Sequence, residues 1–251
     1  GNGGSTDALV SDLGNQGLQA GVAQLGVRKV PFLERLQGAV TYDHITGKFA
    51  FDMLTVGTFM GNGHTGHHLL GQVGAHNELD RPTANLGLIY RWVNPSQDLM
   101  LGGNAFYDRD FETGAQRLGA GVEAITGSVR AFSNYYTPLN DQWYVSPEDD
   151  ELEERAASGV DLGVAYRPAW LPTLDMQVTG SRWNGEAVDV FGTGQTERDP
   201  TVYSAKIGYT PVPLITASLE QSHVSGGEQD TQLMLQVNYK FGTPLTEQPD
   251  L

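Results

Sequence analysis

The stretch DTQLMLQVNYKFG, residues 230–242, alternates between apolar and mostly polar side chains. Its apolar register is Leu233, Leu235, Val237, Tyr239 and Phe241, and its other register is Gln232, Met234, Gln236, Asn238 and Lys240. Side chains that alternate with a period of two point to opposite faces of a β-strand. We therefore predict a strand with two unlike faces, as found in a half-buried soluble sheet or in a membrane barrel.

Composition leaves both kinds of sheet open but excludes several functions. The 251 residues carry a net charge of −15, which disfavours nucleic acid as a partner. The chain has no Cys, which removes disulfides, thiolate metal sites and cysteine nucleophiles. It has no run of roughly 18 or more apolar residues that would predict a membrane helix, and its first residues do not resemble a signal peptide. A membrane barrel is compatible with this composition, because half of each strand faces water.

Alternating segments follow one another through most of the chain. The 32 Gly and 12 Pro fall within and between these segments, as in an all-β protein with many turns. Twelve strands are predicted, at 34–45, 48–59, 68–78, 83–93, 98–108, 116–126, 128–137, 158–167, 174–183, 201–211, 214–223 and 231–241. Before them, residues 6–27 have a ragged apolar face and are predicted to form a short helix, which Pro31 ends.

Two features favour a membrane barrel over a soluble β-sandwich. Aromatic residues lie at the ends of the apolar registers, as in the girdles of membrane barrels. They are Trp92, Tyr166, Tyr209, Tyr239 and Phe241, which we expect to face lipid or the interface.

The connections between the predicted strands also alternate in length. Short connections are predicted at one end of the barrel, at 94–97, 126–127, 167–173 and 211–213. Long, polar connections are predicted at the other end, at 108–116, 139–158 and 184–200. The connection 61–67 belongs to the first end and is long for a turn there.

These features together predict an all-β fold, a twelve-stranded antiparallel transmembrane β-barrel with a short N-terminal helical segment. The barrel is expected over 34–241, after a segment 1–33 and before a segment 242–251. The polar register is rich in Gly, Ser, Asn, Gln and charges, which is typical of a wet lumen and not of a dry core. The residues predicted to face this lumen are Asn85, Arg91, Arg117, Glu123, Arg130, Lys206, Gln236, Asn238 and Lys240.

Three clusters could carry chemistry, and each has a simpler structural explanation. The histidines of GNGHTGHHLL, residues 61–70, match no zinc spacing and are explained by a polar Gly-rich turn. The acidic run 148–154 lacks the Gly and the spacing of a calcium loop, so a solvated loop explains it, with loose cation binding left open. Ser222 and His223 are strand neighbours that point to opposite faces, so they form no direct catalytic dyad. We expect no enzyme activity, no cofactor and no metal site.

Four stretches resemble the β-domain of the intimin/invasin family, the inverse autotransporters of Gram-negative bacteria. They are GGNAFYDRDFETGAQRLGAGVEA (102–124), EERAASGVDLGVAYRPAWLPTL (153–174), YTPVPLITASLEQ (209–221) and GGEQDTQLMLQVNYKFGTPLTEQ (226–248). The motif Asn-x-Phe-Tyr-Asp-x-Asp at Asn104 to Asp110 is fairly specific, and so is the run YTPVPL. The similarity covers nearly all of residues 34–248.

This resemblance implies an outer-membrane anchor and translocator that exports and displays a C-terminal adhesin passenger. It implies a periplasmic segment 1–33, both ends of the barrel on the periplasmic side, and a linker beginning at 242–251 that passes back through the lumen. The expected partners are outer-membrane lipid and lipopolysaccharide, the barrel-assembly machinery and the chain's own passenger linker, around a monomeric barrel. The charged lumen residues could satisfy one another, hold a threaded linker, or do both. A porin-like channel, an outer-membrane enzyme and a soluble β-rich binding protein remain the alternatives.

Overall fold

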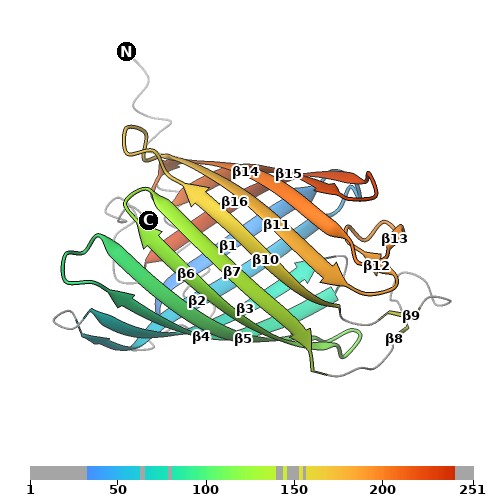
Figure 1. Cartoon of the computed structure of the whole chain (residues 1–251), viewed down its shortest axis with the longest axis horizontal. Coiled ribbons are helices and arrows are strands. Elements are labelled where there is room, and N and C mark those ends of the chain that lie inside the picture. Colours follow the sequence, from blue (N-terminus) through green and yellow to red (C-terminus); the bar gives the residue numbers. More distant parts are fainter. Residues whose placement is uncertain are drawn as a thin grey trace, which may run out of the picture.

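A computed structural model describes residues 33–62, 66–78, 81–139, 144–145, 153–154 and 157–240, and these residues form a closed β-barrel (Figure 1). Its twelve strands are β1 (Leu33–Asp43), β2 (Phe49–Asn62), β3 (His67–Glu78), β4 (Arg81–Val93), β5 (Leu99–Asp110), β6 (Gln116–Thr126), β7 (Val129–Pro138), β10 (Ser158–Tyr166), β11 (Leu174–Asn184), β14 (Thr201–Val212), β15 (Ile215–Val224) and β16 (Gln229–Lys240). Four two-residue strands lie in the connections, namely β8 (Tyr144–Val145), β9 (Glu153–Glu154), β12 (Val188–Asp189) and β13 (Thr196–Glu197).

The barrel closes through an antiparallel pairing of β1 with β16. The apolar register of the opening sequence stretch meets its counterpart on β1, with Leu235 opposite Val40 and Leu233 opposite Tyr42. Closure leaves no edge among the twelve barrel strands, so each of them has hydrogen-bonding neighbours on both sides, as a sheet within lipid requires. The predicted twelve-stranded antiparallel transmembrane barrel is confirmed.

The two ends of the barrel differ in the length of their connections. At one end the connections are 63–66, 94–98, 127–128, 167–173 and 213–214, and here β1 begins and β16 ends. At the other end they are 44–48, 79–80, 111–115, 139–157, 185–200 and 225–228. These ends are called the short-turn end and the loop end; the short strands β8, β9, β12 and β13 lie at the loop end, on the right of Figure 1. The connection after β2 is shorter than the sequence suggested, because β2 continues to Asn62 past an irregularity between Thr58 and Met60.

Side chains fix the connections at both ends. In the short turn after β4, Asn94 Oδ1 accepts the backbone N–H groups of Asp98 and Leu99, each at 3.1 Å. In the loop 185–200, the Asp189 carboxylate accepts four consecutive backbone N–H groups, from residues 191–194, at 2.7–3.2 Å. An Asx-type arrangement of this kind replaces the missing strand hydrogen bonds and orders the loop.

Some sequence-based predictions lie outside the described residues. These are the helix over 6–27, the segments 1–33 (apart from Leu33) and 242–251, the aromatic Phe241, and most of the acidic run 148–154. They remain predictions. No helix in the described part of the chain is long and apolar enough to cross a membrane.

Candidate functional site in the barrel lumen

Large apolar side chains occupy the outer face of the barrel. Along the middle of the strands they are highly exposed, with Val122 at 63% and Leu162 at 65% of full exposure, whereas their polar neighbours in sequence are much less exposed. Side chains on the convex face of a barrel diverge, and those on the concave face converge and contact one another. An apolar band of this extent matches the lipid-facing surface of a transmembrane barrel. We therefore propose that the polar register lines the lumen.

Aromatic side chains of the outer face gather near both ends. Trp92, Tyr166, Tyr209 and Tyr239 all lie near the short-turn end, in the last residues of β4, β10, β14 and β16. A second set lies near the loop end, and the sequence analysis did not single it out. It consists of Phe49, Phe51, Tyr135 and Tyr203, each more than half exposed. The signal that could have found them is an aromatic residue at the loop end of an apolar register: Tyr203 lies opposite Tyr209 on β14, and Phe49, Phe51 and Tyr135 lie on β2 and β7.

In the lumen, one carboxylate is shared by two arginines. Arg91 on β4 donates Nε–H to Glu123 Oε1, and Arg130 on β7 donates Nε–H to Glu123 Oε2, both at 3.0 Å. Glu123 on β6 and Arg91 on β4 are separated by strand β5. On β5 the residue that pairs with both of them is Gly102. A Cβ at Gly102 would lie 2.7 Å from Glu123 Cγ, so the glycine leaves room for the carboxylate to reach past β5.

A second polar chain crosses the same wall closer to the loop end. Arg117 donates from Nε and Nη2 to Asp108 Oδ2, at 3.0 and 2.9 Å. Asn85 Nδ2 donates to the other oxygen of Asp108 at 2.5 Å, and Gln72 Nε2 donates to Asn85 Oδ1 at 2.8 Å. This hydrogen-bonded chain joins β3, β4, β5 and β6, and it uses two of the residues predicted to face the lumen.

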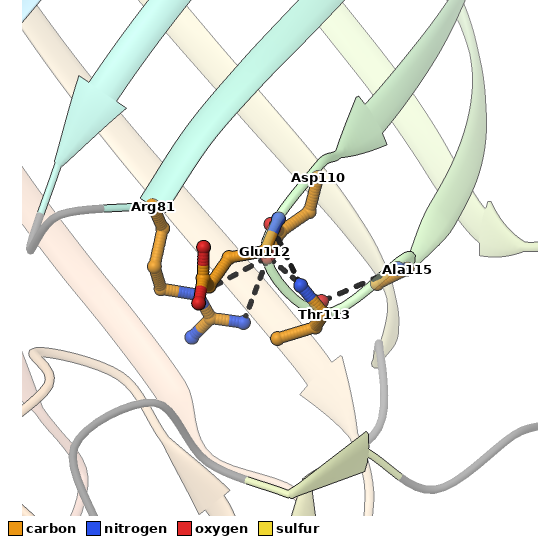
Figure 2. A network of polar contacts seen from close by, with 5 residues as sticks. All are labelled: Arg81, Asp110, Glu112, Thr113 and Ala115. Atoms are coloured by element: carbon orange, nitrogen blue, oxygen red, sulfur yellow. Dashed lines mark hydrogen bonds and ion pairs between the residues drawn. The ribbon is translucent and has the colours of Figure 1, made fainter.

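The sequence motif at Asn104 to Asp110 ends in an ordered turn (Figure 2). Asp110, the last residue of β5, accepts the backbone N–H of Glu112 at 2.8 Å and of Thr113 at 3.2 Å, and the Thr113 hydroxyl at 2.8 Å. Arg81 at the start of β4 donates Nε–H to Asp110 Oδ2 at 3.1 Å. Figure 2 shows Asp110 lying between Arg81 and the turn, with Thr113 Oγ1 accepting the N–H of Ala115 at 3.2 Å. The alternate residues of the motif thus form an inward column along β5.

Aromatic rings in the lumen lie over glycines of neighbouring strands. A Cβ at Gly119 would lie 2.1 Å from Phe106 Cζ, and one at Gly159 would lie 2.4 Å from Trp183 Cε3. Tyr136 stands between these two rings, with centroid distances of 5.6 Å to Phe106 and 5.5 Å to Trp183. Because these positions lack a Cβ, the two rings can pack against the backbone of the neighbouring strand.

The other predicted lumen residues make weaker or more local contacts. Lys206 Nζ lies 3.9 Å from Glu220 Oε2, and Gln236 Nε2 donates to Asn238 Oδ1 at 2.9 Å. Lys240 is paired in the register with Arg35 at the short-turn end. The charged pairs therefore concentrate on β4–β7, and the wall near the β1–β16 closure is largely uncharged between its ends.

The clusters considered for chemistry are separated by the fold. His67 Nδ1 lies 2.6 Å from the Tyr90 hydroxyl, and Ser222 Oγ lies 2.8 Å from Ser204 Oγ, while His223 belongs to the outer register. Among the described residues, no three His, Cys, Asp or Glu side chains are grouped so as to hold a metal ion; His64 and the side chains of 148–154 lie outside that set.

A family model described as "Inverse autotransporter, beta-domain" matches residues 5–251. The chain belongs to this family. Its relatives include intimin of Escherichia coli O127:H6, 32% identical over 179 residues, and invasin of Yersinia enterocolitica, 34% identical over 178 residues. These matches cover 71% and 70% of this chain but only 19% and 21% of the relatives. The uncharacterized protein YchO of Escherichia coli K12 is 32% identical over 177 residues, which is 37% of its length.

The fold of this inverse autotransporter β-domain is similar to that of solved structures. A chain from a study of the in meso crystallisation of membrane proteins is 26% identical, with a TM-score of 0.78 over 86% of this chain and 88% of that one. The KdgM porin in complex with disordered oligogalacturonate is 11% identical, with a TM-score of 0.50 over 82% of this chain and 99% of the porin. The second likeness concerns the fold alone.

Proposed function

We propose that this β-domain is an outer-membrane anchor and translocator that exports a C-terminal passenger and displays it as an adhesin on the cell surface. The observation that carries the proposal is the position at which β1 begins and β16 ends. Strand β16 ends at the short-turn end, next to the start of β1. If this end faces the periplasm, a passenger that follows Lys240 reaches the loop end by the shortest route through the lumen. A relative named "Inverse autotransporter adhesin YeeJ" of Escherichia coli K12, 32% identical over 177 residues, supports an adhesin as the passenger.

The chemistry of the lumen suits an extended polypeptide. A peptide in a closed apolar tube would leave its backbone N–H and C=O groups unpaired, at a cost of a few kcal/mol each. Here the wall offers carboxylates, amides and guanidinium groups, and Arg91 and Arg130 keep 37% and 45% of their side-chain surface exposed. A wet, polar wall holds a moving chain without binding it at a single fixed register.

The remaining partners follow from the same arrangement. The exposed apolar band contacts outer-membrane lipid, and the loop end contacts lipopolysaccharide, with the acidic run 148–154 as a loose site for bridging cations. The alternating strand β16 serves as the signal for the barrel-assembly machinery. The closed barrel works as a monomer, since closure leaves no edge for a second copy to extend.

A passenger fusion tests the proposal. A small folded domain with an epitope is fused after Leu251 and produced in Gram-negative cells, and intact cells are treated with antibody or protease. We expect antibody labelling and release of the domain from intact cells. A folded barrel whose fused domain is reached only after the outer membrane is opened would contradict export.

A second candidate is a channel for small solutes, favoured by the partly exposed arginines of the lumen. A persistent open conductance in planar bilayers, unchanged when residues 241–251 are deleted, would favour this channel over a lumen filled by the chain's own linker.

A further inference from the structure

Two buried carboxylates on the lumen face have no cationic partner. The acidic residues that are buried in the described part of the chain are Asp43, Asp108, Asp110, Glu123 and Asp230. The three in the middle of this series form ion pairs with arginines. Asp43 and Asp230, only 7% and 2% exposed, form no ion pair with any residue that the structure describes. A buried negative charge without a partner is costly, so this pair requires a physical explanation.

The two residues meet at the loop end, where the barrel closes. Asp43 is the last residue of β1, and Asp230 is the second residue of β16. Asp43 lies opposite Gln232, two residues from Asp230, so all three side chains lie on the lumen face. The backbone N–H of His44 donates to the carbonyl of Thr231 at 3.0 Å, which holds the turn after β1 against the start of β16. The pair joins the first and the last strand, so no spacing in the sequence could reveal it.

Each carboxylate has one oxygen that is poorly satisfied. Asp43 Oδ1 accepts the N–H of Thr46 at 2.9 Å, but Asp43 Oδ2 has only a long contact with Gln232 Nε2, at 3.4 Å. Asp230 Oδ1 accepts the N–H of Ile45 at 3.4 Å, and Asp230 Oδ2 is buried without any hydrogen-bond partner. The two negative charges also repel each other across the closure. An enclosed carboxylate oxygen without a donor, beside a second acid, points to a cation.

We propose that Asp43 and Asp230 bind a divalent cation, Ca²⁺ by preference, which fastens β1 to β16. Ca²⁺ takes oxygen ligands from carboxylates, amide and backbone carbonyls and water, in a flexible geometry. The two carboxylates and the side-chain oxygen of Gln232, reached by turning its amide over, supply the protein part of such a shell. Mg²⁺ demands a stricter octahedral geometry, which suits a site with long contacts less well.

The place of this site in the barrel gives the cation a role. Every other pair of neighbouring barrel strands is joined by the turn or loop that connects them, whereas β1 and β16 are held together by non-covalent contacts alone. Repulsion between two carboxylates weakens this closure, and a divalent cation balances both charges. The site thus makes the closure of the barrel depend on a cation. This inference is independent of the proposed export, because it concerns only the folded barrel.

Thermal unfolding of the purified barrel in non-ionic detergent, followed by circular dichroism, tests the site. The unfolding temperature is compared in EDTA and in about 10 mM Ca²⁺, at about pH 8, where free carboxyl groups are ionised. We expect Ca²⁺ to raise it by roughly 3–10 °C, as for a site with a Kd of about 10⁻⁴–10⁻³ M. Asp230→Asn should lose most of this rise. In EDTA the same variant should unfold no earlier than the unchanged chain, because the repulsion is gone.

Asp175→Asn is the matched control. Asp175 is a half-buried acid near the short-turn end of β11, and β14 and β15 separate this strand from β16. This variant should keep the full rise in Ca²⁺. If Asp230→Asn does not fold, Asp43→Asn replaces it, since Asn keeps an oxygen for the N–H of Thr46. Equilibrium dialysis with radioactive Ca²⁺ should show one bound ion fewer per barrel in either variant of the pair than in the control.

Three outcomes would overturn the inference. The first is an unfolding temperature that Ca²⁺ leaves unchanged. The second is a rise of equal size in the unchanged chain, Asp43→Asn and Asp230→Asn, which would place the bound ion elsewhere on the barrel. The third is stabilisation of the unchanged chain by acid, at about pH 5, with no response to Ca²⁺ at about pH 8. In that case the two carboxylates share a proton and bind no cation.

Discussion

Asp108 receives two hydrogen bonds from a single guanidinium, since Arg117 donates Nε–H and Nη2–H to the same Oδ2 at 3.0 and 2.9 Å. Its other oxygen accepts from Asn85 at 2.5 Å. Three neighbouring strands are thereby tied together on the lumen side, at the sequence motif Asn104 to Asp110. The motif has a structural explanation: its alternate residues build the polar wall.

Replacing Asp108 with Asn should destabilise the barrel. The change removes the charge partner of Arg117 and one acceptor, and we expect a loss of about 1–3 kcal/mol in the free energy of unfolding. Urea unfolding in lipid vesicles, followed by Trp fluorescence, measures it. Glu220→Gln is the matched control, because its contact with Lys206 is long, at 3.9 Å, and such pairs contribute less than about 1 kcal/mol. Equal losses in the two variants would contradict the special role of Asp108.

Gly119 should tolerate no side chain under the Phe106 ring. A Cβ there would lie 2.1 Å from Phe106 Cζ, so Gly119→Ala must displace the ring or the strand, at about 1–3 kcal/mol. At Gly103 the nearest atom lies at 3.9 Å, so Gly103→Ala should be nearly neutral. The temperature at which the folded, fast-migrating band disappears on unboiled gels compares the two variants. The combined change Gly119→Ala with Phe106→Ala should cost less than the sum of its parts, and strict additivity would count against the ring–glycine contact.

Much of this fold could be predicted from the sequence because alternation and turn residues locate strands directly. The predicted strand 98–108 ends at Asp108, whereas β5 continues to Asp110, and the two carboxylates bind arginines on the neighbouring strands β6 and β4. The second aromatic set, which includes Phe49 and Tyr203, was not predicted, because these residues are among the first of their strands, directly after a turn or loop.

The pairing of the lumen charges could not be predicted. Glu123 meets Arg91 only because the registers of β4, β5 and β6 place Gly102 between them, and a shift of two residues would break the contact. Such registers depend on all twelve strands closing together. In the loop 185–200, the Asp189 carboxylate accepts four backbone N–H groups. This order could not be predicted either, because such contacts produce no periodic pattern in the sequence.

The assignment of the two faces can be tested on β16. Leu235 lies near the middle of this strand and is 52% exposed, and Gln236 follows it on the lumen side. An arginine on the lipid face near the middle of the membrane should cost about 2–4 kcal/mol, whereas one in a wet lumen should cost much less. The folded fraction after refolding into lipid vesicles, read from the heat-dependent gel shift, should fall for Leu235→Arg and stay high for Gln236→Arg. The reverse order would mean that the faces are assigned backwards.

Cysteine labelling tests the central claim most directly, because the chain has no Cys of its own. Single cysteines are placed at Ser96 in a short turn, at Gln195 in a loop, and in a passenger domain fused after Leu251, and intact Gram-negative cells are treated with a maleimide that does not cross the outer membrane. We predict that Gln195→Cys and the passenger cysteine are labelled on intact cells, and that Ser96→Cys is labelled only after the outer membrane is opened. If the passenger cysteine instead behaves like Ser96→Cys while Gln195→Cys is labelled, the chain does not pass through the lumen, and the barrel is an anchor or a channel without export.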